Sequence, residues 1–307
     1  MGEAAIGRFR SATNQWITTS TWKPKGKVRA VVQIVHGMAE HIACYDETAK
    51  RLNEAGFLVV GHNHPGHGEK AELLGWFGKG GFDSLVEITH TVRLKTQKAY
   101  PRVPYFLLGH SMGSFVVRSY CLKHERGLSG VILSGTGWFP SSKVLPGLLL
   151  AKLFCAFGAE KKPAKLIESI SFAGYNKGWS PLRTPKDWIS RNEQKVDAYI
   201  ADPLCGFTFT AGAYRDMFSG MKVLLHPESL SAMVKKVPVL LYSGAEDPVG
   251  DRGEGVKKVA AALKAAGVKD VTIKLYENGR HEMHNEPNRE EVFTDLIAWI
   301  DGHGALQ

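Results

Sequence analysis

The sequence of 307 residues has little cysteine and no long hydrophobic run. Its four cysteines, Cys44, Cys121, Cys155 and Cys205, form no Cys-x-x-Cys pair, so we expect buried thiols and neither a zinc site nor a disulfide framework. No stretch reaches the roughly 18 apolar residues that a membrane-spanning helix needs. The opening segment, MGEAAIGRFRSATNQW, lacks an apolar core of signal-peptide length. We therefore expect a soluble, cytoplasmic protein.

Acidic residues are outnumbered, with 30 Asp and Glu against 39 Lys and Arg, which gives a formal net charge of +9. A positive field attracts polyanions, including nucleic acids and anionic membranes. The lysines are nevertheless spread along the chain, with one local cluster in EKKPAK (160–165), and no aromatic residues alternate with them as in surfaces that stack bases. We expect no nucleic-acid partner, whereas weak attraction to anionic lipid stays open.

Strand-like apolar runs alternate with segments of helical periodicity over most of the chain. This alternation predicts an α/β fold with a mainly parallel central sheet and helices on both faces. We expect the first two strands to form an antiparallel hairpin around the KPKGK turn. The expected strands are 15–22, 28–37, 56–63, 103–110, 130–135, 237–244 and 271–277, and the expected helices are 84–100, 114–124, 254–267 and 290–300.

The alternation is interrupted between residues 138 and 236, a region rich in Phe, Trp, Leu and Lys that contains no clear strand. It predicts a helical insertion that divides the core into residues 1–137 and 237–307. In open α/β sheets, ligands bind beyond the carboxyl ends of the strands. An insertion that leaves the end of the strand at 130–135 would cover that site as a cap, or lid.

The segment GHSMG (109–113) places Ser111 between two glycines, after an apolar strand and before a helical pattern. A strand, a tight turn and a helix are the setting of a nucleophile elbow, in which glycines avoid clashes around a strained serine. Because a serine hydroxyl is a weak nucleophile, this interpretation requires a base, an acid that orients the base, and an oxyanion site. The alternative is an ordinary turn whose serine caps the helix.

Candidates for the acid and the base follow later strands. Asp247 lies in LLYSGAEDPVG (240–250) and His281 in ENGRHEMHNEP (277–287), so the order of serine, acid and histidine is that of α/β-hydrolases. Glu246 and His284 are the nearest alternatives. The HEMH segment does not indicate a metal, because zinc-binding histidines of metalloproteases are four residues apart on a helix, whereas these are three apart in a loop.

An oxyanion site needs two backbone N–H groups directed at the developing negative charge. The loop VHGMAEH (35–41) follows the first long strand and offers the N–H of Met38. The N–H of Met112, directly after the serine, is the second candidate.

Five segments together, HGMAEH, HNHPGHG (62–68), GHSMG, SGAEDPVG and GRHEMHNE, resemble the monoacylglycerol lipase and lysophospholipase-like branch of the α/β-hydrolases, also called serine aminopeptidase S33-like hydrolases. The resemblance covers most of the chain outside the cap. It implies Ser111 as nucleophile, Asp247 as acid, His281 as base, and Met38 and Met112 as oxyanion donors. One departure is Asn63, where the family has an acidic residue at the start of the loop.

The resulting prediction is a serine hydrolase that cleaves carboxylic esters with an apolar acyl chain through an acyl-enzyme, with a small ester or lipid as substrate and no metal or cofactor. A peptidase or amidase of the same fold, and a non-catalytic ligand-binding protein, are the alternatives. The aromatic and apolar residues of the insertion predict an acyl pocket, and a short amphipathic segment beside EKKPAK predicts weak peripheral membrane contact. The pocket candidates are Trp138, Phe139, Leu145, Trp179 and Phe207.

Overall fold

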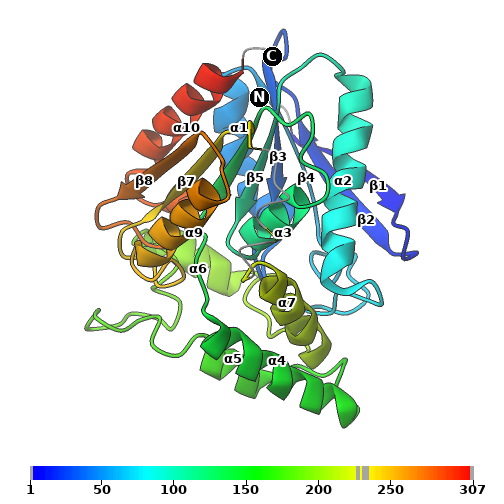
Figure 1. The fold of residues 1–307 in the computed structure, drawn as a ribbon, viewed down its shortest axis with the longest axis vertical. Coiled ribbons are helices and arrows are strands. Elements are labelled where there is room, and N and C mark those ends of the chain that lie inside the picture. The colour runs from blue at the N-terminus through cyan, green and yellow to red at the C-terminus, as the bar shows by residue number, and fades with distance from the viewer. Residues whose placement is uncertain (1–2, 226–228, 230–234, 305–307) are drawn as a thin grey trace.

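The computed structural model describes residues 3–225, 229 and 235–304 (Figure 1). Its centre is an eight-stranded sheet in the order β1-β2-β4-β3-β5-β6-β7-β8. The strands are β1 (Ala5–Arg10), β2 (Trp16–Trp22), β3 (Ala30–Val35), β4 (Phe57–His62), β5 (Tyr105–His110), β6 (Gly130–Ser134), β7 (Val239–Gly244) and β8 (Val271–Tyr276).

From β4 to β8 every neighbouring pair of strands is parallel, as expected from the alternating pattern. All residues of the five inner strands β3 to β7 are buried, because helices cover both faces of the sheet. Burial on both faces explains why these strands are short continuous apolar runs. The edge strand β8 (VTIKLY) is only partly buried, and its sequence alternates between apolar and polar residues more than those of the inner strands.

The expected hairpin between the first two strands is wrong. β2 pairs antiparallel with β1 and with β4, and β4 separates it from β3. No sequence pattern predicts β1, because this strand (AIGRFR) is almost entirely exposed and needs no apolar alternation. β3 instead pairs with β4 through a parallel crossover that contains α1 (Asp46–Glu54), a helix that was also not expected.

Two helical layers enclose the sheet, as Figure 1 shows. The core on one face includes side chains of α2 (Gly81–Ala99), α3 (Met112–Cys121) and α9 (Glu254–Ala265), and the core on the other face includes those of α1 and α10 (Arg289–His303). The helices at 84–100, 114–124, 254–267 and 290–300 are thereby confirmed within a few residues at each end.

Among the described residues between β6 and β7, the structure has the helices α4 (Ser141–Ala156), α5 (Lys165–Ser171), α6 (Glu193–Ala201) and α7 (Ala211–Val223). Figure 1 shows α4, α5 and α7 together below the sheet. The helical character expected for this segment is confirmed, while residues 226–228 and 230–234 lie outside the described part of the chain. α4 continues through Pro146 and Gly147, and the Phe218 ring of α7 packs so closely that a Cβ on Gly147 would lie 2.9 Å from it.

Among the described residues, no helix has both the length and the apolar character that crossing a bilayer requires. The expectation of buried thiols is correct for Cys121 alone, because the other three cysteines are only half-buried. Cys44 and Cys205, which are far apart in the sequence, have their sulfur atoms 3.7 Å from each other.

Candidate active site

Ser111 occupies the turn between β5 and α3 with φ 52° and ψ −120°, a conformation that non-glycine residues rarely adopt. The turn is very tight: a Cβ on Gly109 would lie 2.4 Å from the carbonyl oxygen of Gly113, and a Cβ on Gly113 would lie 2.0 Å from that of Val35. Both clashes involve backbone atoms, so both positions require glycine. The strand, turn and helix expected around GHSMG are present, and the Ser111 N–H is fixed by Ser134 O at 2.9 Å.

His281 and Asp247 form a buried pair. The Nδ1 atom of His281 lies 3.0 Å from both carboxylate oxygens of Asp247. That carboxylate also accepts hydrogen bonds from Ser243 Oγ and from the backbone N–H of Val249, each at 2.9 Å. A histidine that donates from Nδ1 presents Nε2 as a hydrogen-bond acceptor.

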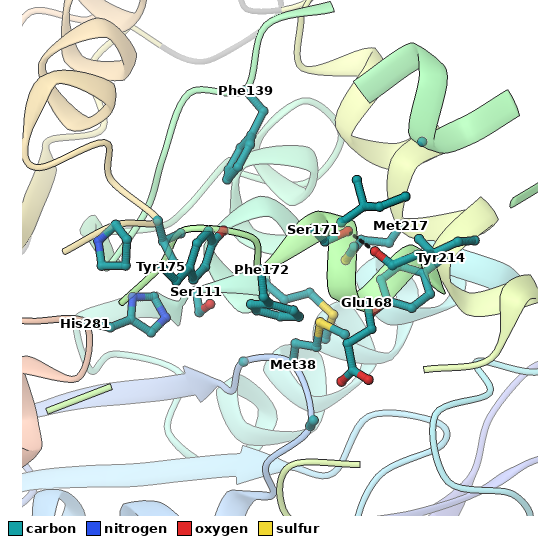
Figure 2. A pocket seen from close by; sticks show the side chains of 18 of the residues that line it. Met38, Ser111, Phe139, Glu168, Ser171, Phe172, Tyr175, Tyr214, Met217 and His281 are labelled. Atoms are coloured by element: carbon teal, nitrogen blue, oxygen red, sulfur yellow. Dashed lines mark hydrogen bonds between the residues drawn. The ribbon is translucent and has the colours of Figure 1, made fainter. Parts of the chain in front are cut away.

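The side chains of Ser111 and His281 line the same cavity, and Figure 2 shows both on one part of its wall. Asp247 lies behind His281 and is fully buried. The structure therefore brings together the serine, histidine and aspartate singled out in the sequence.

The two alternative residues have other partners. The Glu246 carboxylate accepts a hydrogen bond from the indole N–H of Trp179 at 3.0 Å. His284 is buried and stacks on Tyr45, with ring centres 4.9 Å apart, and burial lowers its pKa to about 3. Neither residue belongs to the cavity wall.

The loop after β3 is held by side chains on either side of Met38. Gly37 donates its N–H to the Glu40 carboxylate, and Ala39 donates its N–H to His67 Nε2 at 3.3 Å. Within the described residues, neither Met38 nor Met112 donates its backbone N–H to a protein acceptor. Both residues line the cavity that contains Ser111.

The cavity has a volume of about 560 Å³, within the usual range for small-molecule sites. Of the residues singled out for an acyl pocket, Phe139 and Phe207 line it. Further apolar and aromatic lining residues, several of them drawn in Figure 2, are Phe115, Leu150, Ile167, Phe172, Tyr175, Trp188, Tyr214, Met217, Phe218 and Met221.

Trp138, Leu145 and Trp179 were assigned to the pocket wrongly. Trp138 is half-buried, packs against the core, and lines a separate small hollow with residues of α3 and α7. Leu145 is on the outer side of α4 and is 43% exposed. The guanidinium carbon of Arg280 lies 4.3 Å from the centre of the Trp179 ring, and the indole N–H of Trp179 donates a hydrogen bond to Glu246. The apolar character of a residue in the insertion does not show whether its side chain faces the cavity or another side of its helix or loop.

Four of the wall residues that the sequence analysis missed had one available signal. Tyr214, Met217, Phe218 and Met221 of α7 follow the spacing i, i+3, i+4, i+7, which places them on one face of a helix. By contrast, Tyr175 and Trp188 lie outside helices and strands, where no periodicity identifies them.

A polar group of side chains lines the cavity near Ser111. Burial raises the pKa of Glu40 well above its usual range, and the nearby Glu282 raises it further. Burial also raises the pKa of Glu282 to about 7. Tyr45 donates its hydroxyl to Glu40 Oε1 at 2.8 Å, and Tyr199 lines the cavity beside both carboxyl groups. Part of the wall can therefore form hydrogen bonds with an uncharged polar group.

Asn63, the departure from the resembled family, has a structural partner. Its side-chain oxygen accepts a hydrogen bond from the backbone N–H of Ile42 at 2.8 Å. An uncharged amide is sufficient for this contact, and Asn63 is not part of the cavity wall.

Comparisons with known proteins agree with this geometry. The family model described as "Serine aminopeptidase, S33" matches residues 26–288. The rat monoglyceride lipase is 29% identical over 302 residues, which cover 94% of this chain and 88% of that protein. The monoacylglycerol lipase of Mycolicibacterium smegmatis is 29% identical over 297 residues, which cover 94% and 93%.

A solved structure shows the same likeness in three dimensions. The thermostable carboxyl esterase from Bacillus coagulans, crystallised in complex with glycerol, superposes with a TM-score of 0.91 at 32% identity, over 98% of this chain and 99% of that one. Because the family model spans most of the sequence and the fold agrees, this chain belongs to the serine aminopeptidase S33 family of α/β-hydrolases.

Proposed function

We propose that this serine ester hydrolase cleaves esters with an apolar acyl chain, as a monoacylglycerol lipase or a lysophospholipase-like carboxylesterase, through an acyl-enzyme on Ser111. The observation that carries the proposal is the buried His281–Asp247 pair, whose histidine shares a large apolar cavity with a serine on a strained turn. The relatives named as monoglyceride lipases and as a carboxyl esterase support the ester as substrate.

Each residue of the site has a role in the proposed mechanism. His281 Nε2 accepts the proton of the Ser111 hydroxyl as its oxygen attacks the ester carbonyl, and Asp247 fixes the ring and stabilises its charged form. The N–H groups of Met38 and Met112 donate to the oxyanion that forms. His281 then protonates the leaving alcohol, and water releases the acid from the acyl-enzyme.

The chemistry of the wall supports the assignment of the two parts of the substrate. The aromatic and methionine side chains of α7, with Phe139 and Phe207, suit an acyl chain. The carboxyl groups of Glu40 and Glu282, with their raised pKa values, suit the hydroxyl groups of a leaving alcohol. A monoacyl glycerol has both parts.

We further propose that residues 138–236 act as a cap on a core made of 1–137 and 237–307, and that the protein is cytoplasmic and touches anionic membrane surfaces through α4. Two observations support the membrane contact. Leu149 and Leu153 of α4 are 70% and 50% exposed, and Phe157, directly after this helix, is 81% exposed. Exposed lysines occur in and after this helix, at Lys143, Lys152, Lys161, Lys162 and Lys165.

A series of p-nitrophenyl esters from two to sixteen carbons tests the proposed function. Each methylene that enters an apolar cavity contributes up to about 0.8 kcal/mol. We expect kcat/KM to rise severalfold for every two carbons until the cavity is full. A sharp maximum at the acetate ester would contradict the lipid substrate, and faster cleavage of aminoacyl anilides than of esters would indicate a peptidase.

The matched variants are Ser111→Ala and Ser142→Ala, since Ser142 is a second serine on the cavity wall. We expect Ser111→Ala to lose several orders of magnitude in kcat with an unchanged melting curve, and to escape labelling by a fluorophosphonate. Ser142→Ala should keep both activity and labelling. Residual activity of more than a few per cent in Ser111→Ala would rule out this nucleophile.

A further inference from the structure

Four side chains with metal-binding atoms meet behind the loop that carries Met38. His41 and Cys44 come from the segment after β3, where His41 precedes and Cys44 lies in a short 3-10 helix (Ile42–Tyr45), and Asp202 and Cys205 come from the turn after α6. One atom of each, a ring nitrogen, a carboxylate oxygen or a sulfur, lies within 4.8 Å of the other three. We refer to these four residues as the His-Cys-Asp-Cys cluster.

The two halves of the cluster have the same local design. In each, a ligand-type residue is followed three positions later by a cysteine, and the cysteine N–H donates to the carbonyl oxygen of the first residue at 3.0 Å. These are His41 and Cys44 in one turn and Asp202 and Cys205 in the other. Two-residue spacers on tight turns are typical of structural zinc sites. The sequence did not reveal the site, because each half has one cysteine and the halves are about 160 residues apart.

The distances within the cluster are close to those of a tetrahedral site. Two sulfur ligands on a tetrahedral zinc ion lie about 3.8 Å apart, since each Zn–S bond is about 2.3 Å. The sulfur atoms of Cys44 and Cys205 are 3.7 Å apart. His41 Nε2 and Asp202 Oδ2 are 2.8 Å apart as a hydrogen-bonded pair, and would separate by about half an ångström around an ion. The ligand atoms that are farthest apart, which lie within 4.8 Å of each other, would approach by about 1 Å around the ion.

We propose that the His-Cys-Asp-Cys cluster binds one structural zinc ion, with His41 Nε2, Asp202 Oδ2 and the sulfur atoms of Cys44 and Cys205 as its four ligands. Four protein ligands fill a tetrahedral shell and leave no position for water or substrate, so the ion has no part in the hydrolysis. The other oxygen of Asp202 is already fixed, because it accepts the N–H of Leu204 at 2.8 Å. Such an outer contact orients a ligand for the metal.

The place of the site suggests what the ion stabilises. The cluster joins the chain after α6 to the loop after β3, and the same two segments meet at Ala39. The carbonyl oxygen of Ala39 accepts the N–H of Gly206 at 2.8 Å and the hydroxyl of Tyr199 at 3.1 Å. A bound ion would therefore hold this junction, next to Met38, without contacting the substrate.

Cobalt(II) is the direct probe, because thiolate ligation gives it a charge-transfer band and tetrahedral geometry gives it intense d–d bands. The full-length protein is reduced, stripped with a chelator and titrated with Co²⁺ and then with Zn²⁺ while spectra are recorded. We expect one equivalent of Co²⁺ to bind with both signatures and Zn²⁺ to displace it. Zn²⁺ should also raise the melting temperature of the stripped protein.

Cys44→Ser and Cys205→Ser remove one ligand each, and Cys155→Ser is the matched control, a half-buried cysteine outside the cluster. Loss of an outer-shell contact alone weakens metal binding by about 10- to 100-fold, so loss of a ligand should weaken it at least that much. The control should bind Co²⁺ as the unmodified protein does. Circular dichroism of each stripped variant shows that it is folded.

Two results would overturn the zinc site. The first is a reduced, folded protein that takes up no Co²⁺ with a thiolate band, in which case His41 and Asp202 form an ordinary ion pair beside two thiols. The second is Co²⁺ binding that Cys44→Ser leaves unchanged. Both readouts are independent of ester hydrolysis, so they are valid whether or not Ser111 is the nucleophile.

Discussion

Gly113 shows at the scale of one residue how the sequence determines the turn at Ser111. A Cβ at this position would lie 2.0 Å from the carbonyl oxygen of Val35, and a backbone atom cannot rotate away. Gly302 in α10 is the matched control, because a Cβ there would have no atom within 4 Å. We predict that Gly113→Ala lowers the free energy of unfolding by about 3 kcal/mol or more, whereas Gly302→Ala raises it by up to about 1 kcal/mol.

Urea denaturation of the two alanine variants beside the unmodified protein measures both changes. If Gly113→Ala were as stable as Gly302→Ala, the turn would have room for a side chain. The geometry described for Ser111 would then be incorrect.

The candidate residues that the structure places close together are those that the sequence predicts at the ends of strands. Ser111, Asp247 and His281 each follow an apolar run, and the structure brings all three together. Trp138 and Trp179 could not be placed by the same reasoning. Their side chains contact residues that are distant in the sequence; Trp179, for example, donates a hydrogen bond to Glu246. Residue type predicts that such a side chain is buried or in contact with other residues. The direction in which the side chain points depends on the tertiary structure.

At the scale of secondary structure elements, the buried strands were predictable from the sequence, whereas the exposed strand β1 was not. Each of the five inner strands is an apolar run, because both of its faces are covered. β1 is mostly exposed and is not predicted from the sequence. Without β1, the prediction leaves β3 as the neighbouring strand with which β2 would pair. The order of the strands depends on the crossover from β3 to β4 through α1. The residue pattern of β2 does not indicate that it pairs with β4 instead of β3.

The exposed face of α4 leads to a prediction about membrane binding. We expect the double variant Leu149→Ser/Phe157→Ser to bind anionic lipid vesicles at least about tenfold more weakly, because burying each of these side chains contributes about 1.5 to 3 kcal/mol. Neither residue belongs to the cavity wall, so hydrolysis of a soluble butyrate ester should be unchanged. Vesicle co-sedimentation and ester kinetics measure the two effects.

The control for α4 is Leu94→Ser, which removes a leucine that is 53% exposed on α2. If this control weakened vesicle binding as much as the α4 variant, the contact would be a general effect of surface hydrophobicity. An unchanged affinity of the α4 variant would show that the membrane, if it is bound, is bound elsewhere.

At the scale of the whole molecule, the buried histidines couple folding to pH. Burial lowers the pKa of six of them far below the usual value, so they stay uncharged in the folded protein: His36, His62, His64, His67, His110 and His284. Burial raises the pKa of Glu40, Glu125 and Glu282, which has the opposite effect on stability. Total stability against pH is therefore a sum of opposing contributions, and a single histidine must be isolated by comparison.

His62 is the most suitable histidine, because it is fully buried and neither ring nitrogen has a hydrogen-bond partner among the described residues. Burial lowers its pKa to about 3, whereas an unfolded histidine titrates near 6.5. Between these values the unfolded state binds a proton that the folded state does not, so His62 destabilises the fold increasingly as pH falls below 6.5. We predict that replacing His62 with leucine removes a penalty of about 2 kcal/mol at pH 5 that is absent at pH 7.5.

The measurement is the free energy of unfolding of the unmodified protein and of His62→Leu at both pH values. The difference at pH 7.5 reports the change in packing alone, since His62 is uncharged in both states there. The glutamates titrate alike in the two proteins, so their effect cancels from the comparison. Unfolding free energies that fall in parallel from pH 7.5 to pH 5 would show that His62 takes up a proton in the folded protein, and that its site admits either water or a charged partner.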